Sequence, residues 1–343
     1  MRGLFHPALL HLPTGDPGVW VDMPDEGRAL LLDLPPITHV AHRKLLRVAH
    51  AIVTHTHMDH YVGFDHLLRI ALRREDEITI TGPEGFLASV RGRVAAYAWN
   101  LIASYPVRLR VQEVAGDVLR AELYSAASGM RPEPCEDAPF TGTVHAERAF
   151  RVDVVALDHG LPVLGVAVRE VEHLAVDRDR LERRGLAPGP WLARLKDAIR
   201  SREHDDTPIP AEREDGVIVT LPLGEIGPDI VRRGPGQALG YLTDLAGTEE
   251  NLARAAGLVR DVDLLLCEAA FLEADRDLAE ERRHLTARQA GALARAAGAK
   301  RLSIFHLSPR YEGREHELFQ EAAAAFGVPT LDVPIVPAAT IRA

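Results

Sequence analysis

The hydrophobic residues of this chain fall in short runs, separated by turn-forming residues and by longer amphipathic stretches. Apolar runs at 4–12, 19–21 and 29–34 are divided by glycine-containing turns and predict an opening region of β-strands. Further strands are predicted at 51–53, 77–81, 107–114, 119–124, 151–157, 216–221, 238–242, 262–267 and 301–305. Helices are predicted at 61–74, 82–100, 248–259, 286–298 and 313–326. Such a mixture is typical of a layered α/β protein.

One stretch concentrates potential metal ligands. His55-Thr56-His57-Met58-Asp59-His60 directly follows the β-branched run that ends at Val53. Alternate residues of an extended chain point to the same side, so His55 and His57 can reach one ion. Asp59 and His60 come as the chain turns into a helix and can serve a second ion beside the first. The simpler interpretation is a polar loop that happens to be rich in histidine.

Three later strands also end at a possible ligand, namely His159, Asp244 and His306. Taken alone, His159 is more typical of a structural residue, and an aspartate such as Asp244 is common as a helix or turn cap. Beside the histidine-rich stretch, however, the repeated strand-end position favours one shared pocket. A carboxylate at Asp244 could then lie between two ions and hold them close together.

These segments carry a resemblance to a known family. The pattern H-x-H-x-D-H after a strand resembles the metallo-β-lactamase superfamily. His284-Leu285-Thr286-Ala287 and His306-Leu307-Ser308-Pro309-Arg310 make the chain more specifically similar to ribonuclease Z. The ordered motifs extend over roughly residues 29–326. The resemblance implies an α/β (α+β) fold, a four-layer αβ/βα sandwich, formed as one domain over residues 1–343.

The resemblance also assigns roles to the candidate residues. One zinc ion would be bound by His55, His57 and His159, a second by Asp59, His60 and His306, and Asp244 would bridge the two. Two Zn²⁺ are therefore expected as cofactors, although imidazole and carboxylate ligands also accept Mn²⁺ or Fe.

By resemblance, the activity is that of a zinc-dependent phosphodiesterase that removes 3′ trailers from precursor tRNA through a metal-bridging hydroxide. Asp59 would orient the hydroxide, and His284, which is not a ligand in the family, would protonate the leaving oxygen. Thr286, Ser308 and Arg310 are candidates for holding the scissile phosphate, with Arg310 favoured because a guanidinium matches phosphate oxygens as a fork. Thr286 is equally a helix N-cap candidate.

The charged stretch around 172–215 resembles the protruding arm of ribonuclease Z, which grips transfer RNA. Its basic residues are Arg180, Arg183, Arg184, Arg194, Lys196 and Arg200. Phosphate contacts need local rather than net positive charge. Acidic residues at 205–215 weaken the argument, and an exposed linker is an equally simple interpretation.

Composition excludes some classes of protein. A net charge of −10 argues against a generally nucleic-acid-coating surface, and no apolar run is long enough to span a bilayer. The two cysteines, Cys135 and Cys267, are no disulfide framework, so a cytoplasmic protein is expected, with Cys267 as a buried free thiol. Members of the family usually form homodimers, and the same is expected here.

Two segments depart from the family pattern, Leu12-Pro13-Thr14-Gly15-Asp16 and Gly63-Phe64-Asp65-His66-Leu67-Leu68. Both border the mouth of the site in the family, so the substrate could instead be a small phosphodiester or, less in keeping with His284 and Arg310, a lactone or thioester. From another class of protein, a silent binding module on the same scaffold predicts missing ligands, but every expected ligand is present.

Overall fold

The structure, a computed structural model, describes residues 3–328, which form two compact units. The described part of the larger unit consists of residues 5–144, 152–168 and 238–328, and that of the smaller unit of residues 3–4, 145–151 and 169–237. The expected arm, 172–215, lies within the long segment of the smaller unit.

The first sheet of the larger unit has nine strands in the order β1-β2-β3-β4-β5-β6-β7-β8, with β9 also paired to β7. These strands are β1 His6–Leu9, β2 Val19–Met23, β3 Arg28–Leu32, β4 Val48–Ile52, β5 Ile78–Pro83, β6 Arg108–Ala115, β7 Val118–Ser125, β8 Glu133–Pro134 and β9 Ala138–Pro139. A second sheet has the order β10-β11-β12-β17-β18-β19. Its strands are β10 Thr143–Ala146, β11 Phe150–Asp158, β12 Pro162–Glu170, β17 Ala238–Leu242, β18 Leu264–Glu268 and β19 Leu302–Phe305.

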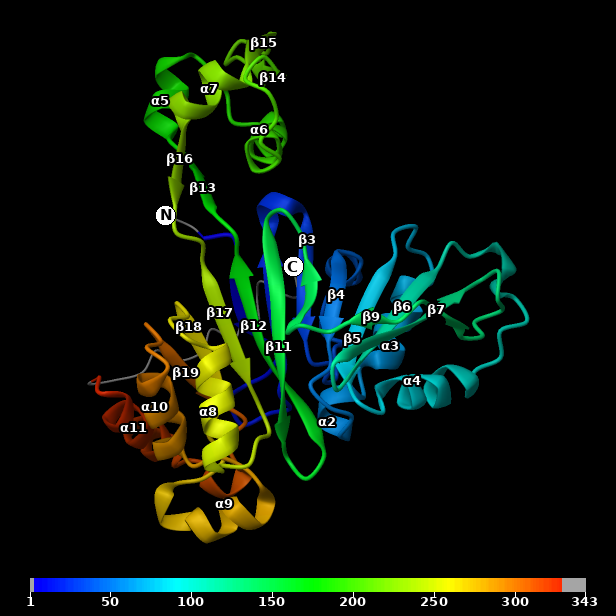
Figure 1. Ribbon diagram of the computed structural model, residues 1–343, viewed down its shortest axis with the longest axis vertical. Helices are drawn as coiled ribbons and strands as arrows, with labels where there is room; N and C mark the ends of the chain where they lie inside the picture. Colours follow the sequence, from blue (N-terminus) through cyan, green and yellow to red (C-terminus); the bar gives the residue numbers. More distant parts are fainter. Residues whose placement is uncertain (1–2, 329–343) are drawn as a thin grey trace. The chain divides into compact units, whose positions relative to one another are not determined.

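Helices cover the two sheets of the larger unit (Figure 1). They are α1 His42–Leu45, α2 Met58–Tyr61, α3 Phe64–Ala71, α4 Phe86–Ala95, α8 Glu249–Leu258, α9 Arg276–Arg282, α10 Ala287–Ala296 and α11 Glu315–Phe326. Phe64 and Phe86 anchor α3 and α4 in the core of the first sheet, and Leu293 and Leu318 anchor α10 and α11 against the second. The sandwich order expected from the sequence, helix–sheet–sheet–helix, is confirmed.

Parallel pairing explains why distant side chains reach one edge. Strands β17, β18 and β19 run parallel, so their carboxyl ends, followed by Asp244 and His306, lie at the same end of the sheet. In the other sheet, β3 and β4 are also parallel. The ends of these two strands lead into Asp33 and His55.

Some element boundaries differ from the predicted ones. The helix expected over 61–74 corresponds to α3, which begins only at Phe64. Before it, the backbone of Gly63 packs directly against that of Pro35, since a Cβ at Gly63 would lie 2.1 Å from the Pro35 carbonyl oxygen. The helix expected from Gly82 begins at Phe86, because β5 continues through Pro83 in pairing with β6.

The smaller unit has its own core. It contains β13 His173–Val176 paired with β16 Val231–Gly234, and the hairpin of β14 Pro208–Glu212 with β15 Ile218–Pro222. Helices α5 Arg178–Arg183, α6 Trp191–Arg200 and α7 Leu223–Ile230 accompany them. Trp191, Leu195 and Ile226 are buried among these elements. Among the described residues, no helix combines the length and apolar character needed to cross a membrane.

Candidate active site

All seven predicted ligands converge at the ends of strands in the larger unit. His55 and His57 follow β4, and Asp59 and His60 lie in the short helix α2. Potential ligand atoms lie within 4.8 Å of one another in the group His55, His57, His159 and Asp244, and again in the group Asp59, His60 and His306. The tertiary structure therefore brings together residues from four separate parts of the sequence.

Asp244 lies between the two groups. Its Oδ2 atom is 3.6 Å from His55 Nε2, 3.3 Å from His60 Nε2 and 3.7 Å from His159 Nε2. Its Oδ1 atom is 3.2 Å from His306 Nε2. One carboxylate thus faces both groups, which is the arrangement that a bridging ligand requires.

The donor atoms fit a bound cation. Nε2 of His55 and Nε2 of His60 are buried and have no hydrogen-bond partner, although buried polar atoms are nearly always paired. Burial, together with the nearby histidines, lowers the pKa of His55 to about 2, so its ring is neutral and its lone pair is available. Imidazole and carboxylate donors with unpaired atoms aimed at one point suit divalent transition metals.

A buried carboxylate that sequence reasoning did not single out holds His60. Asp33 follows β3 and accepts a hydrogen bond of 2.9 Å from His60 Nδ1. It also accepts from the Thr54 backbone N–H at 2.7 Å and from the Tyr241 hydroxyl at 2.8 Å. The bond to Nδ1 fixes the tautomer and turns His60 Nε2 toward Asp244. Asp33 stands at the end of a strand, as the predicted ligands do, and this position could have indicated it from the sequence.

A second unpredicted carboxylate pairs with His284. Glu268 is the last residue of β18 and is fully buried, and its Oε2 accepts from His284 Nδ1 at 2.8 Å. Its Oε1 accepts from the Leu245 N–H at 2.7 Å, next to Asp244. Burial lowers the pKa of His284, but the charge and hydrogen bond of Glu268 outweigh burial and raise that pKa to about 9. The Glu268 carboxylate therefore favours the protonated ring of His284, which lies beside the ligand groups, 4.9 Å from the ring of His159.

Backbone conformation around the site is strained. Asp33, Asp244, Arg283 and His306 have φ values of 62°, 49°, 59° and 55°, in the left-handed region that non-glycine residues rarely adopt. Such conformations persist where the surrounding structure imposes them, and they concentrate at functional sites.

The three predicted phosphate-binding residues have different surroundings. Thr286 is fully buried: its hydroxyl accepts from Gln289 N–H in a capping box and donates to Glu273, so the structure assigns it to the start of α10 and does not present it to a substrate. Ser308 is partly exposed and follows His306 by two positions. Arg310 is exposed, with its guanidinium 3.5 Å from Asp275. Cys267 is buried and unpaired, as expected.

The arm segment is less basic than its arginines suggest. Arg180 and Arg184 bond to Asp229, and Arg194 forms a fork with Glu203. Arg200 lies 3.8 Å from Asp197. Over residues 169–237 there are 14 Asp and Glu residues but only 12 Arg and Lys residues. Most of the predicted basic cluster is therefore neutralised locally.

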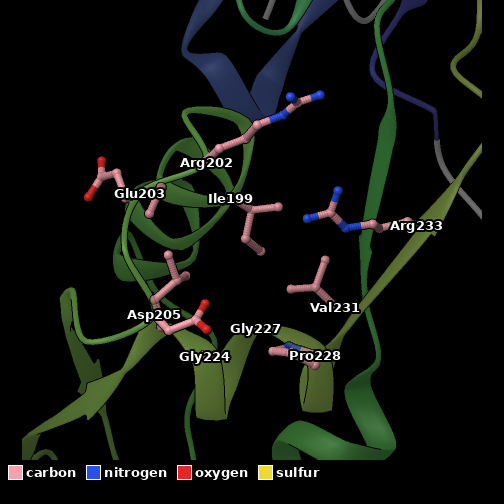
Figure 2. Close-up of a pocket in the computed structure, with 11 residues that line it drawn as sticks. Ile199, Arg202, Glu203, Asp205, Gly224, Gly227, Pro228, Val231 and Arg233 are labelled. Carbon is pink, nitrogen blue, oxygen red and sulfur yellow. The ribbon is translucent and has the colours of Figure 1, made fainter.

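The smaller unit contains a cavity of about 440 Å³ (Figure 2). Arg233 reaches into it from β16 and the Asp205 carboxylate faces it from another side, with Ile199 and Val231 between them. Arg202 stands at the rim, and its side chain has no ion pair within residues 3–328. The cavity thus combines an apolar wall with two arginines and two carboxylates, those of Glu203 and Asp205.

Solved structures identify the class of fold. The chain resembles the metallo-β-lactamase fold protein YhfI from Bacillus subtilis, with a TM-score of 0.53 and 13% identity over 94% of this chain and 93% of that one. It also resembles the short form of human tRNase Z, with a TM-score of 0.51 and 19% identity over 89% and 92% of the two chains. The chain therefore has the metallo-β-lactamase fold, with two groups of potential metal ligands at the ends of its strands.

Sequence similarity narrows the class to a family. The chain is 35% identical to a ribonuclease Z of Deinococcus radiodurans over 93% of its own length and 95% of that protein. It is 31% identical to a ribonuclease Z of Thermobifida fusca, over 81% of this chain and 74% of that one. No family model matches the sequence. The chain belongs to the ribonuclease Z family.

Proposed function

We propose that this enzyme is an endoribonuclease that removes 3′ trailers from precursor tRNA. The observation that carries the proposal is the Glu268–His284 pair placed beside two ligand groups that share Asp244. A metal pair with an adjacent acid suits hydrolysis of a phosphodiester, whose leaving oxygen must gain a proton. Membership in the ribonuclease Z family supports RNA as the substrate.

For the cofactors we propose two Zn²⁺, with Mn²⁺ or Fe as chemically acceptable replacements. His55, His57 and His159 would hold one ion and Asp59, His60 and His306 the other, with Asp244 between them. Bound there, the ions would activate a water molecule and offset the charge that develops on the phosphoryl oxygens. The unpaired Nε2 atoms of His55 and His60 support this assignment.

The side chains perform the remaining steps. Asp59 is partly exposed, with Oδ2 3.5 Å from His60 Nε2 and 3.9 Å from His306 Nε2, so it can accept a hydrogen bond from the attacking water and orient it. His284 donates its Nε2 proton to the leaving oxygen, while Glu268 stabilises the charged ring and holds its orientation. The products are a tRNA 3′-hydroxyl and a trailer with a 5′-phosphate.

For substrate contacts near the site we propose Ser308 and Arg310. Both follow His306 closely in the sequence and carry solvent-accessible groups. Arg310 offers a planar fork of donors, and its contact with Asp275, at 3.5 Å, is loose enough to exchange for phosphate. Thr286 is retained in our proposal only as the residue that caps α10.

We also propose that the segment 169–237, which contains the arm expected at 172–215, contacts RNA and is an insertion in a single metallo-β-lactamase-fold domain. Because most of its other arginines are neutralised, the contact would concentrate at the cavity lined by Arg202, which has no ion pair within residues 3–328, and by Arg233, which already pairs with Glu172. A phosphate beside the two guanidinium groups and a base against Ile199 and Val231 would suit its composition. A homodimer and a cytoplasmic location complete the proposal, the latter supported by two unpaired cysteines.

A small phosphodiester is the alternative substrate. The observation that favours it is the excess of carboxylates over basic residues in the arm segment. A lactone or thioester substrate fits less well, because it has no phosphate for Arg310 to bind and gives His284 no comparable role.

The deciding experiment offers the purified, zinc-loaded protein a 3′-extended precursor tRNA and, separately, bis(p-nitrophenyl) phosphate. We expect efficient cleavage at the end of the mature tRNA and slow cleavage of the small diester. His284→Ala should lose RNA cleavage more severely than cleavage of the small diester, because nitrophenolate is a good leaving group that needs little protonation. If precursor tRNA stays intact while the small diester is cleaved rapidly, the substrate is a small phosphodiester and the RNA proposal is wrong.

A further inference from the structure

Helix α9 ends at a residue that its backbone conformation disfavours. Arg283 has φ 59° and ψ 40°, and the next N–H, of His284, bonds back to the Ala279 carbonyl at 2.9 Å. This C-terminal motif normally carries glycine, because glycine alone adopts left-handed φ without steric cost. An arginine at this position is therefore retained against a local conformational penalty.

The backbone of Arg283 orients a candidate ligand. Its carbonyl oxygen accepts a hydrogen bond of 2.8 Å from His159 Nδ1. That bond places the proton on Nδ1 and leaves the Nε2 lone pair of His159 facing Asp244. Since the same peptide group leads directly into His284, one left-handed residue positions both a candidate ligand and the candidate acid.

The side chain of Arg283 lies on the rim of the same site. It packs over Gly160, where a Cβ would lie 3.1 Å from the Arg283 Cδ and Nε atoms. Its Nη1 donates to Asp158 Oδ2 at 3.2 Å, and Asp158 Oδ1 in turn accepts from the Gly160 N–H at 2.7 Å. The guanidinium is thus held beside His159 while half of the side chain stays exposed.

Local structure gives no adequate reason for arginine here. The ion pair with Asp158 joins two side chains that are each about half exposed, and such pairs contribute little to stability. A small gain of this kind does not offset a left-handed arginine where glycine would fit. The position of the guanidinium beside the ligand groups supplies the missing reason.

We infer that Arg283 has two roles: its carbonyl positions His159 for metal binding, and its guanidinium binds a phosphate of the substrate next to the scissile bond. The first role depends only on the ligand groups. The second rests on the proposed function, because it requires a phosphodiester substrate. A guanidinium that is already oriented presents its fork to phosphate oxygens at low entropic cost.

The first role is tested by titrating metal-free protein with Zn²⁺ in a calorimeter. Arg283→Gly keeps the left-handed turn and the carbonyl, so it should bind Zn²⁺ like wild type and melt about 1–3 °C higher. Arg283→Val, whose branched side chain resists this conformation, should move the carbonyl and weaken Zn²⁺ binding by about tenfold or more. Unchanged Zn²⁺ affinity in Arg283→Val would overturn this role.

Asp261→Val is the matched control. Asp261 is also left-handed, with φ 56°, but it is exposed and follows α8, away from the ligand groups. Asp261→Val should lower the melting temperature about as much as Arg283→Val does, but its Zn²⁺ affinity should stay normal. An equal loss of Zn²⁺ affinity in both valine variants would make the effect one of general destabilisation and overturn the inference.

The second role is tested by steady-state kinetics with precursor tRNA. Arg283→Gly, fully loaded with zinc, should lose about tenfold in kcat/KM, mainly through KM, while Arg283→Lys should lose less. A wild-type KM in Arg283→Gly would overturn the phosphate contact. If wild type itself does not cleave the RNA, the proposed function fails separately, and KM values for bis(p-nitrophenyl) phosphate decide whether Arg283 binds phosphate.

Discussion

The two units differ in whether their clustered polar and charged side chains are paired with one another. In the larger unit, imidazole and carboxylate groups converge, and two buried Nε2 atoms are left without any hydrogen-bond partner. In the smaller unit, most arginines lie on the surface, and most are paired with a carboxylate of the same unit.

This difference shows how a functional cluster can be told from a solvated surface. Buried donors without partners carry a free-energy penalty that a bound ligand would remove. Paired surface charges have no such deficit, and each pair contributes little. In the arm, Arg202 is exposed, lies at the cavity and has no ion pair within residues 3–328, so it can contact a phosphate without first giving up a carboxylate. The following predictions test this contrast.

The largest effect is expected from removing the shared carboxylate. Asp244→Ala should lower kcat/KM for precursor tRNA by on the order of 10³-fold and reduce the zinc content measured by elemental analysis, since both groups lose a ligand. Asp263→Ala removes an aspartate from the same sheet that bonds to Lys300, and should retain activity and zinc. Normal zinc content in Asp244→Ala would show that Asp244 does not bridge the two ligand groups.

Glu268→Gln should lower kcat by roughly 100-fold while zinc content and KM stay close to wild type, because the proton donor loses its stabilising charge. In the proposed mechanism His284 acts in its protonated form, so activity should be lost as the pH rises through its pKa. Without the Glu268 carboxylate, burial is the largest remaining influence on the pKa of His284, and it lowers that pKa. The alkaline limb of the kcat–pH profile should therefore move to lower pH.

Glu273→Gln is the control for this variant. Glu273 accepts a hydrogen bond from the Thr286 hydroxyl and pairs with Arg276, outside the ligand groups. It should lower the melting temperature slightly and leave the pH profile in place. An unmoved alkaline limb in Glu268→Gln would show that His284 is not the titrating acid.

Asp33→Asn should weaken Zn²⁺ binding at the proposed site of Asp59, His60 and His306 about 10- to 100-fold in calorimetry, since His60 loses the charged acceptor that fixes its tautomer. Glu122→Gln removes another buried carboxylate, bonded to Arg91 and Tyr124, and should reduce stability without changing Zn²⁺ affinity. Equal Zn²⁺ affinities in Asp33→Asn and wild type would mean that His60 is held by packing alone.

The smallest effect is expected in the arm. Arg202→Ala should raise KM for precursor tRNA roughly two- to tenfold and reduce the salt dependence of binding by about one counterion, with no effect on a small diester. Arg184→Ala removes an arginine already bonded to Glu225 and Asp229 and should leave KM unchanged. If Arg184→Ala has the larger effect, pairing is no guide to RNA contact in this unit.

Local sequence patterns were sufficient for much of the fold. The strand 238–242 was predicted with the observed bounds, because its apolar residues are flanked by turn signals. Boundaries moved where a tertiary contact decided them. Gly63 interrupts the helix expected from Tyr61 because the chain passes against Pro35, a contact between segments that no local pattern encodes.

The groups that support the site were the harder part to predict. Asp33 and Glu268 each stand at the end of an apolar run, like the predicted ligands, but lack a distinctive neighbouring motif. Only their bonds to His60 and His284 distinguish them from ordinary strand-end carboxylates. Thr286 shows the reverse case, since its place in a motif suggested substrate contact and its burial assigns it to a cap.

The sequence by itself determined which residue types are present and at which strand ends they occur, because hydrophobic periodicity and turn chemistry act over a few residues. It therefore indicated His55, His57, His159, Asp244 and His306 before any fold was known. The tertiary structure decided which side chains are left unpaired, which are neutralised and which backbone positions are strained. Those properties depend on distances between residues far apart in the chain, and only the packed sheets fix these distances.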